Sequence, residues 1–132
     1  QTCALPISYQ YANDFRDIFD IGLDSLARAR AAGEDEVLST LTVYLTFLGS
    51  FPDSHISRKY GPHRAQSLLL DARGFNAQFS SAARSDRIAS ALKWDAALKQ
   101  NSLNPGTSAD LTVATLFADK LAQSLANVPK NG

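Results

Sequence analysis

The chain of 132 residues has little cysteine, no excess of either charge and no long apolar run. Its single cysteine, Cys3, permits no internal disulfide and no zinc site built from cysteines. Thirteen basic residues balance thirteen acidic ones, so no overall field attracts nucleic acid or an anionic membrane. No apolar run approaches the roughly 20 residues that span a bilayer. These absences favour a cytoplasmic protein that binds neither nucleic acid nor membranes.

What the sequence does have is apolar content with a helical period. Hydrophobic residues make up 45% of the chain, which is sufficient for one domain with a core. From Tyr9 onward they recur at three- and four-residue steps, and no segment shows the alternation typical of a β-hairpin. We therefore predict an all-α fold, a bundle of about five helices with short connections.

The periodicity also gives approximate helix bounds, which are residues 11–32, 34–50, 62–79, 85–100 and 107–126. The second of these helices is apolar on most sides, so we expect it to be central and buried. For the last helix we expect a broad buried face made of Leu111, Val113, Ala114, Thr115, Leu116, Phe117, Ala118, Leu121 and Leu125.

The first eight residues differ from the rest, because they show no helical period and contain the only cysteine. We interpret residues 1–8 as an irregular terminus that is not necessarily native. Residues 9–132 form the helical portion of a single domain, with no internal repeat and no domain boundary.

The most informative segment is the entrance to the last helix. A turn with Asn104, Pro105 and Gly106 leads into it, and Thr107 and Asp110 have the spacing of a capping box. Gly106 permits close approach of the backbone, and the N–H groups of a first helical turn point outward. Such a helix start can bind phosphate, and a nearby carboxylate can bind the metal ion of a polyphosphate. The alternative is an ordinary capped helix after a Pro-Gly turn.

A second polar cluster follows the apolar helix that ends near residue 50, in a segment that we expect to be a connection at a helix end. Arg58 and Lys59 suit phosphate, while Asp53 suits Mg²⁺ or the orientation of His55. His55 can transfer a proton near neutral pH. The alternative is a solvated connection in which Asp53 caps a helical turn. Two clusters of this kind indicate a phosphorylated ligand.

These two segments, DSHISRKYG at residues 53–61 and LNPGTSADLTVATLF at residues 103–117, resemble motifs of triphosphoribosyl-dephospho-CoA synthases. The Asn-Pro-Gly-Thr sequence is more similar to the motif of the malonate decarboxylase branch than to that of the citrate lyase branch. The resemblance runs from about Tyr9 to about Leu125 and corresponds to the C-terminal half of the family's usual length. It implies that residues 9–132 are the C-terminal portion of a helical catalytic domain within a larger all-helical enzyme, inactive if isolated.

The resemblance implies a transferase. It joins ATP and 3′-dephospho-CoA into 2′-(5″-triphosphoribosyl)-3′-dephospho-CoA and releases adenine, for the prosthetic group of malonate decarboxylase or citrate lyase. Such chemistry requires a clamped triphosphate and an oriented acceptor. We expect Mg²⁺ to bind with ATP at Asp110 and Asp53, and His55 and Asp53 to be the catalytic candidates. The expected phosphate-binding residues are Arg58, Lys59, Asn104, Gly106 and Thr107. A homo-oligomer is one possible assembly.

Other polar residues have simpler interpretations. We expect His63 to be solvated in a first helical turn, and Asp95 to pair with Lys99 four residues later. The acidic residues of the first helix form a solvated face, although two of them, Asp20 and Asp24, are spaced to reach a metal; the face comprises Asp14, Asp17, Asp20 and Asp24.

Two other classes of protein fit the same residues. One is a helical interaction module whose polar segments only cap helices, and the other is a nucleotide or ADP-ribosyl hydrolase. The transferase hypothesis requires the His55 and Gly106 segments to face one another across a shared pocket for a magnesium-bound nucleotide tail, and the structure tests whether the two segments meet.

Overall fold

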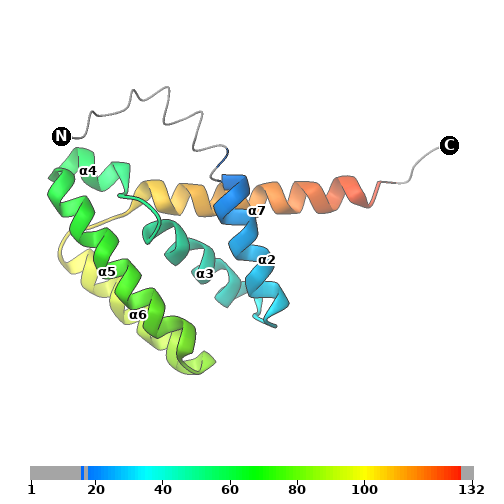
Figure 1. The fold of residues 1–132 in the computed structure, drawn as a ribbon, viewed down its shortest axis with the longest axis horizontal. Coiled ribbons are helices and arrows are strands. Elements are labelled where there is room, and N and C mark those ends of the chain that lie inside the picture. The colour runs from blue at the N-terminus through cyan, green and yellow to red at the C-terminus, as the bar shows by residue number, and fades with distance from the viewer. Residues whose placement is uncertain (1–15, 17, 129–132) are drawn as a thin grey trace.

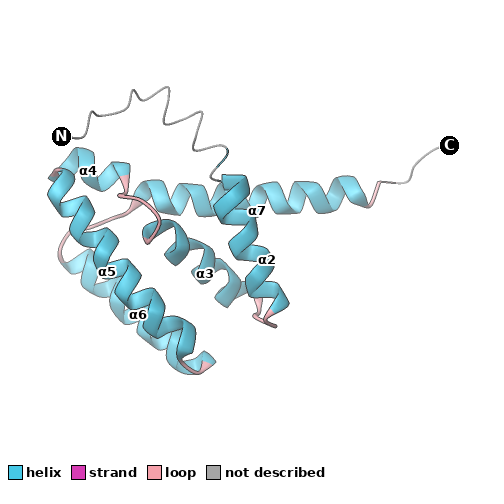
Figure 2. Cartoon of the chain, viewed as in Figure 1, coloured by secondary structure: helices cyan, strands magenta, loops and turns pink. Residues whose placement is uncertain are grey.

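The computed structural model describes residue 16 and residues 18–128. This part of the chain contains helices and no strand, so the predicted all-α class is confirmed (Figures 1 and 2). A π-helical turn leads the order of elements, which is η1 (Ile18–Gly22), α2 (Leu23–Ala31), α3 (Glu36–Leu48), α4 (Ser54–Tyr60), α5 (Pro62–Ser81), α6 (Arg84–Gln100) and α7 (Gly106–Ala126). The start predicted for the first helix, and the irregular terminus at residues 1–8, lie outside the described residues.

Helix α3 is central, as its apolar sequence predicts. It packs against α2, α5, α6 and α7. Asp35 caps its first turn by accepting a hydrogen bond from the Leu38 amide at 2.9 Å. Its side chains contribute to both hydrophobic clusters of the fold, and burial of each large one stabilises the folded state by about 1.5–3 kcal/mol.

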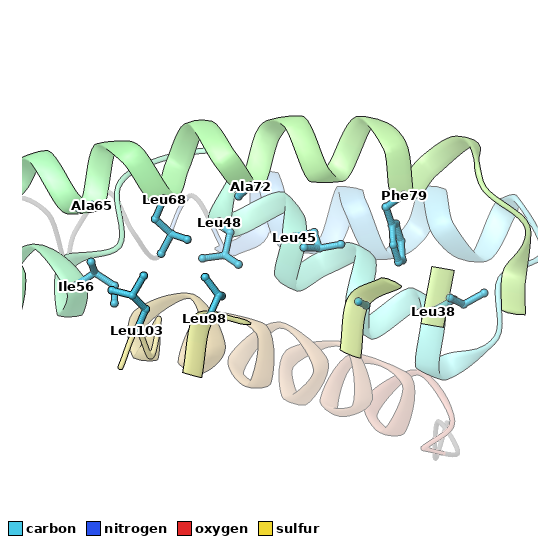
Figure 3. Close-up of a cluster of buried hydrophobic side chains, with 11 residues drawn as sticks. Leu38, Leu45, Leu48, Ile56, Ala65, Leu68, Ala72, Phe79, Leu98 and Leu103 are labelled. Atoms are coloured by element: carbon cyan, nitrogen blue, oxygen red, sulfur yellow. The ribbon is translucent and has the colours of Figure 1, made fainter. Parts of the chain in front are cut away.

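The larger hydrophobic cluster lies between α3, α5 and α6 and is closed at one end by Ile56 of α4 and by Leu103 (Figure 3). The smaller cluster joins α2 to α3 through Leu26, Val43 and Phe47, and Leu111 and Leu116 of α7 pack against it. The two clusters share α3, and so the core fixes the ends of α4 and α7 relative to the same central helix.

The sequence led us to expect a connection at residues 53–61. The structure instead has the short helix α4 there. Asp53 caps its start, and Gly61, with φ of 94°, ends it directly before Pro62 begins α5. Seven residues make only two turns, which is too short for an apolar period to be visible. This extra element raises the number of α-helices in the described part from the expected five to six.

The buried face predicted for α7 is correct only in part. Of its residues Thr115 is buried, but Val113, Phe117 and Leu125 are each about two-thirds exposed, at 66%, 68% and 66%. The C-terminal half of α7, which carries Leu125, extends beyond the other helices (Figure 1). An amphipathic pattern identifies an apolar face, but it does not state how far along the helix a neighbour covers that face.

The junction between η1 and α2 depends on a close approach at Gly22. A Cβ atom at this position would overlap the Thr115 hydroxyl and would lie 2.9 Å from Cζ of Phe47. Helices α3 and α7 therefore both touch the backbone at Gly22. Within the described residues, no helix is long and apolar enough to cross a lipid bilayer.

Replacing Gly22 with Ala should destabilise the fold by about 1–3 kcal/mol, because the added methyl group overpacks a site with no space for it. Urea unfolding measures the change. Gly74→Ala in α5 is the matched control, since nothing lies within 4 Å of the added Cβ; it should stabilise by about 0.5–1 kcal/mol through helix propensity. Equal stabilities of the two variants would contradict the close approach.

Candidate functional site

The starts of α4 and α7 lie side by side (Figure 1). The Ser54 and Thr107 hydroxyl groups are hydrogen-bonded at 2.7 Å, and the His55 amide donates to Thr107 Oγ1 at 3.2 Å. The His55 ring lies against Gly106, where an added Cβ would be 3.4 Å from the ring Cγ atom. The expectation that the two segments come together is therefore confirmed, but they meet in direct contact, and neither of the two hollows described below is the expected pocket between them.

A single buried carboxylate joins the two helix starts. Asp53 is 2% exposed. Its Oδ1 atom accepts hydrogen bonds from the amides of His55 at 2.9 Å and Ile56 at 3.1 Å. Its Oδ2 atom accepts from the Ser108 amide at 2.8 Å and the Ser108 hydroxyl at 2.9 Å. One side chain thus caps α4 locally and caps α7 across 55 residues of sequence.

The surroundings of Asp53 compensate for the burial of its charge. Three backbone amides and a hydroxyl group donate to it. The positive ends of two helix dipoles also meet there. A buried carboxylate without such partners would be strongly unfavourable, so the two helix starts and Asp53 stabilise one another.

The capping box predicted for Thr107 and Asp110 is wrong. Helix α7 begins one residue earlier than expected, at Gly106, with Pro105 at the cap position and no cap bond from the side chain there. Thr107 therefore lies inside the first turn, and its hydroxyl accepts from His55 of α4. With the helix starting at Gly106, the Ser108 amide is one of the unpaired donors of the first turn, and Asp53 of α4 accepts from it, a contact that local sequence spacing cannot reveal.

The remaining predicted residues lie on the same helices or in the turn before α7. Arg58 and Lys59 are exposed at the end of α4, and Asp110 is exposed in α7. Among the described residues, no ion pair involves any of these three. Asn104 is exposed in the turn before α7, and its carbonyl accepts from the Gly106 amide at 2.8 Å. The structure thus places two exposed cations and one exposed carboxylate, none of them in an ion pair with a described residue, on the elements that meet at Asp53.

Two residues of this contact were not predicted as site residues. Ser54 bonds Thr107, and Ser108 bonds Asp53. Tyr60 is a third contributor, because its hydroxyl donates to the Ser102 carbonyl at 2.7 Å and fixes the end of α4 to the turn before α7. The Asp-Ser-His sequence carried a cap signal for α4, but no sequence signal links Asp53 to Ser108.

The predicted magnesium ligands, Asp53 and Asp110, differ in how accessible their carboxylates are. No group of three or more His, Cys, Asp or Glu residues in the described part is arranged to bind a metal ion. Mg²⁺ in nucleotide sites commonly takes one or two carboxylates and completes its shell with phosphates and water. Asp110 fits this role, since its carboxylate is exposed and has no ion-pair partner in the described part. Both oxygens of Asp53 are already hydrogen-bonded.

The site is an open surface. A cavity of about 230 Å³ lies between α5 and α6 beside the turn before α7, and its lining includes Arg64, Asn101 and Leu103. An apolar groove of about 490 Å³ lies between α3 and α6. Neither hollow is lined by a residue of the two helix starts, so a ligand at Thr107 would be approached from solvent.

The clearest perturbations of protonation lie outside the site. Burial raises the pKa of the Tyr44 phenol, and the charges of Asp95 and Asp53 add to the effect, so Tyr44 stays neutral at physiological pH. The pKa of Asp35 is lowered by the Leu38 amide and by Arg84. Arg30 pairs with Asp119 at 2.8 Å, which raises its pKa and links α2 to α7.

The simpler interpretations of the other polar residues agree with the structure. His63 is exposed in the first turn of α5, and Asp95 pairs with Lys99 at 2.6 Å. Asp20 is exposed, and Asp24 pairs with Arg28 at 3.0 Å on the surface. Asp14 and Asp17 lie outside the described residues.

Residues 5–128 match the model of the CitG family, ATP:dephospho-CoA triphosphoribosyl transferase. The chain belongs to this family. The match is slightly longer at both ends than the resemblance seen in the sequence, and it identifies the chain as a member of a transferase family, the triphosphoribosyl-dephospho-CoA synthases. Members of the family use ATP and dephospho-CoA as substrates. No curated protein and no solved structure gives a significant match to the chain.

A double-mutant cycle with Ser54→Ala and Thr107→Val tests the contact between the helix starts. Each change removes one partner of the hydroxyl pair, and the coupling energy should be about 0.5–1.5 kcal/mol in urea unfolding. Thr40, whose hydroxyl bonds only within α3, provides the control cycle with Ser54 and should show no coupling. Additive losses for Ser54 and Thr107 would contradict the contact.

Proposed function

We propose that the paired starts of α4 and α7 bind the triphosphate of ATP for transfer of its triphosphoribosyl unit to 3′-dephospho-CoA. The observation that supports this proposal is the meeting of two segments 52 residues apart, which brings Thr107 to His55. Arg58 and Lys59 end the same short helix that carries His55. Family membership supplies the reaction, and the geometry indicates where this chain contributes to it.

The phosphate contacts fall mainly to side chains. Asp53 already takes the amide donors of His55, Ile56 and Ser108, so these are not available to an external anion. Arg58 offers a planar fork with two parallel donors, and Lys59 offers a compact charge. We also assign Thr107, the Gly106 backbone and Asn104 to the phosphate chain. The Thr107 hydroxyl already bonds Ser54 and the His55 amide, and the Gly106 amide already bonds the Asn104 carbonyl, so these groups would have to exchange a present hydrogen bond for one to phosphate.

Asp110 is the carboxylate that we assign to Mg²⁺. When bound, Mg²⁺ neutralises phosphate oxygens and fixes their orientation. Asp110 lies in α7 about one turn after Thr107 and is exposed to solvent. Its part is to place the metal-bound phosphates beside the cations of α4.

His55 is the candidate for proton transfer. Its backbone amide is held by Asp53 and Thr107, and its ring packs on Gly106. No described residue hydrogen-bonds either ring nitrogen, so both are available to the substrate. Cleavage of the ribose–adenine bond develops negative charge on the departing base, and a proton donor near that base, or an acceptor near the attacking 2′-hydroxyl, lowers the barrier.

The Asn-Pro-Gly-Thr turn before α7 favours the malonate decarboxylase branch over the citrate lyase branch. We also place the protein in the cytoplasm, where ATP and CoA precursors are both present.

Release of adenine tests the proposed function directly. Full-length protein, incubated with ATP, Mg²⁺ and 3′-dephospho-CoA, should form adenine and the triphosphoribosyl product in equal amounts, both measured by chromatography. A sample without 3′-dephospho-CoA is the control. Adenine formed equally in both samples would favour a hydrolase, and an absence of both adenine release and nucleotide binding would remove the transferase proposal for this chain.

Arg58→Lys should weaken binding of Mg²⁺-ATP about tenfold, because the charge is kept but the two parallel hydrogen bonds are lost. Isothermal titration calorimetry measures the affinity. Arg28→Lys is the matched control, since Arg28 is also exposed but pairs with Asp24 on α2. Unchanged affinity in Arg58→Lys would show that this arginine is only solvated.

A further inference from the structure

Asp53 differs from the other aspartate cap in the described part of the fold. Asp35 caps α3 alone, accepts from the Leu38 amide and pairs with Arg84 at the surface. Asp53 is buried, forms no ion pair with a described residue and caps two helices whose starts are far apart in sequence. The cap of α4 uses only the Oδ1 atom of Asp53, so it does not require Oδ2 to be buried against α7.

The hydrogen bonds of Asp53 use its full accepting capacity. An ionised carboxylate has about four lone-pair sites. Two donors bind Oδ1 and two bind Oδ2. A metal ion on either oxygen would have to displace an amide or the Ser108 hydroxyl from a buried position, and that donor would then be unsatisfied.

We infer that Asp53 is a positioning residue, whose buried carboxylate fixes the starts of α4 and α7 relative to one another. Its Oδ1 atom fixes the amides of His55 and Ile56, and its Oδ2 atom fixes Ser108, the neighbour of Thr107. Asp53 thereby sets the distance between His55, the candidate for proton transfer, and Thr107, a candidate for phosphate binding. It does so without touching the substrate. This inference rests on the proposed function for the identity of the ligand, and on the structure alone for the double cap.

The chemistry of the double cap predicts an asymmetric response to Asp53→Asn. The variant has one accepting oxygen and one donating NH₂ group. Directing NH₂ toward α4 would oppose two backbone donors, whereas directing it toward α7 opposes one amide and can donate to the Ser108 hydroxyl oxygen. The amide oxygen should therefore keep the α4 cap, and the α7 cap should be lost.

Hydrogen exchange of the whole chain measures this response. In Asp53→Asn, the amides of residues 106–109 should exchange at least tenfold faster, while those of His55 and Ile56 should change little. Asp35→Asn is the matched control and should affect only the first turn of α3. Unchanged exchange at residues 106–109 in Asp53→Asn would overturn the inference.

Ser108→Ala covers the case in which Asp53→Asn does not fold. It removes one of the two donors to Oδ2 and leaves both donors to Oδ1. Faster exchange confined to residues 106–109 is again expected. Exchange equal to that of the original chain would show that Oδ2 does not fix the start of α7.

Binding of inorganic tripolyphosphate and of ATP, each with and without Mg²⁺, separates positioning from metal coordination. Asp53→Asn should weaken both ligands by a similar factor whether or not Mg²⁺ is present, and Asp110→Asn should weaken them only when it is present. A loss in Asp53→Asn that is confined to samples with Mg²⁺ would make Asp53 a metal ligand and refute the inference. If the original chain binds neither ligand, the proposed function fails while hydrogen exchange still decides the role of Asp53.

Discussion

The hydrogen bonds of the Asp53 carboxylate are the constraint on which the rest of the site depends. Because Asp53 is buried, each of its oxygens needs donors, and only the starts of α4 and α7 supply them. The first turns of the two helices must therefore lie next to one another, on either side of the Asp53 carboxylate. The contacts of Thr107 with Ser54 and His55, and of the His55 ring with Gly106, follow from that placement.

The hydrophobic core makes this placement stable. Helix α3 belongs to both clusters, and α4 is joined to the larger one by Ile56 while α7 is joined to the smaller one by Leu111 and Leu116. Gly22 brings the chain against Thr115 and Phe47, which holds the middle of α7 against α3. The two apolar clusters, which share α3, thus hold α4 and α7 in the positions that allow the polar contact at Asp53.

The double cap also changes how the site can recognise an anion. In many phosphate sites the amides of a helix start bind the ligand directly. Here a carboxylate of the protein already binds those amides. Under the function that we propose, recognition would therefore fall to the exposed cations of α4 and, through Mg²⁺, to Asp110 of α7.

The sequence by itself determined the class of fold, most helix bounds and the family, because apolar period, proline and glycine act locally and because two long motifs carry the resemblance. It also indicated which polar segments matter. Only the tertiary structure decided what each residue does there: residues 53–61 form a helix, Asp53 caps α7, Thr107 does not, and Phe117 and Leu125 are exposed. The physical reason is that caps and burial depend on neighbours more than 50 residues away, which no local spacing encodes.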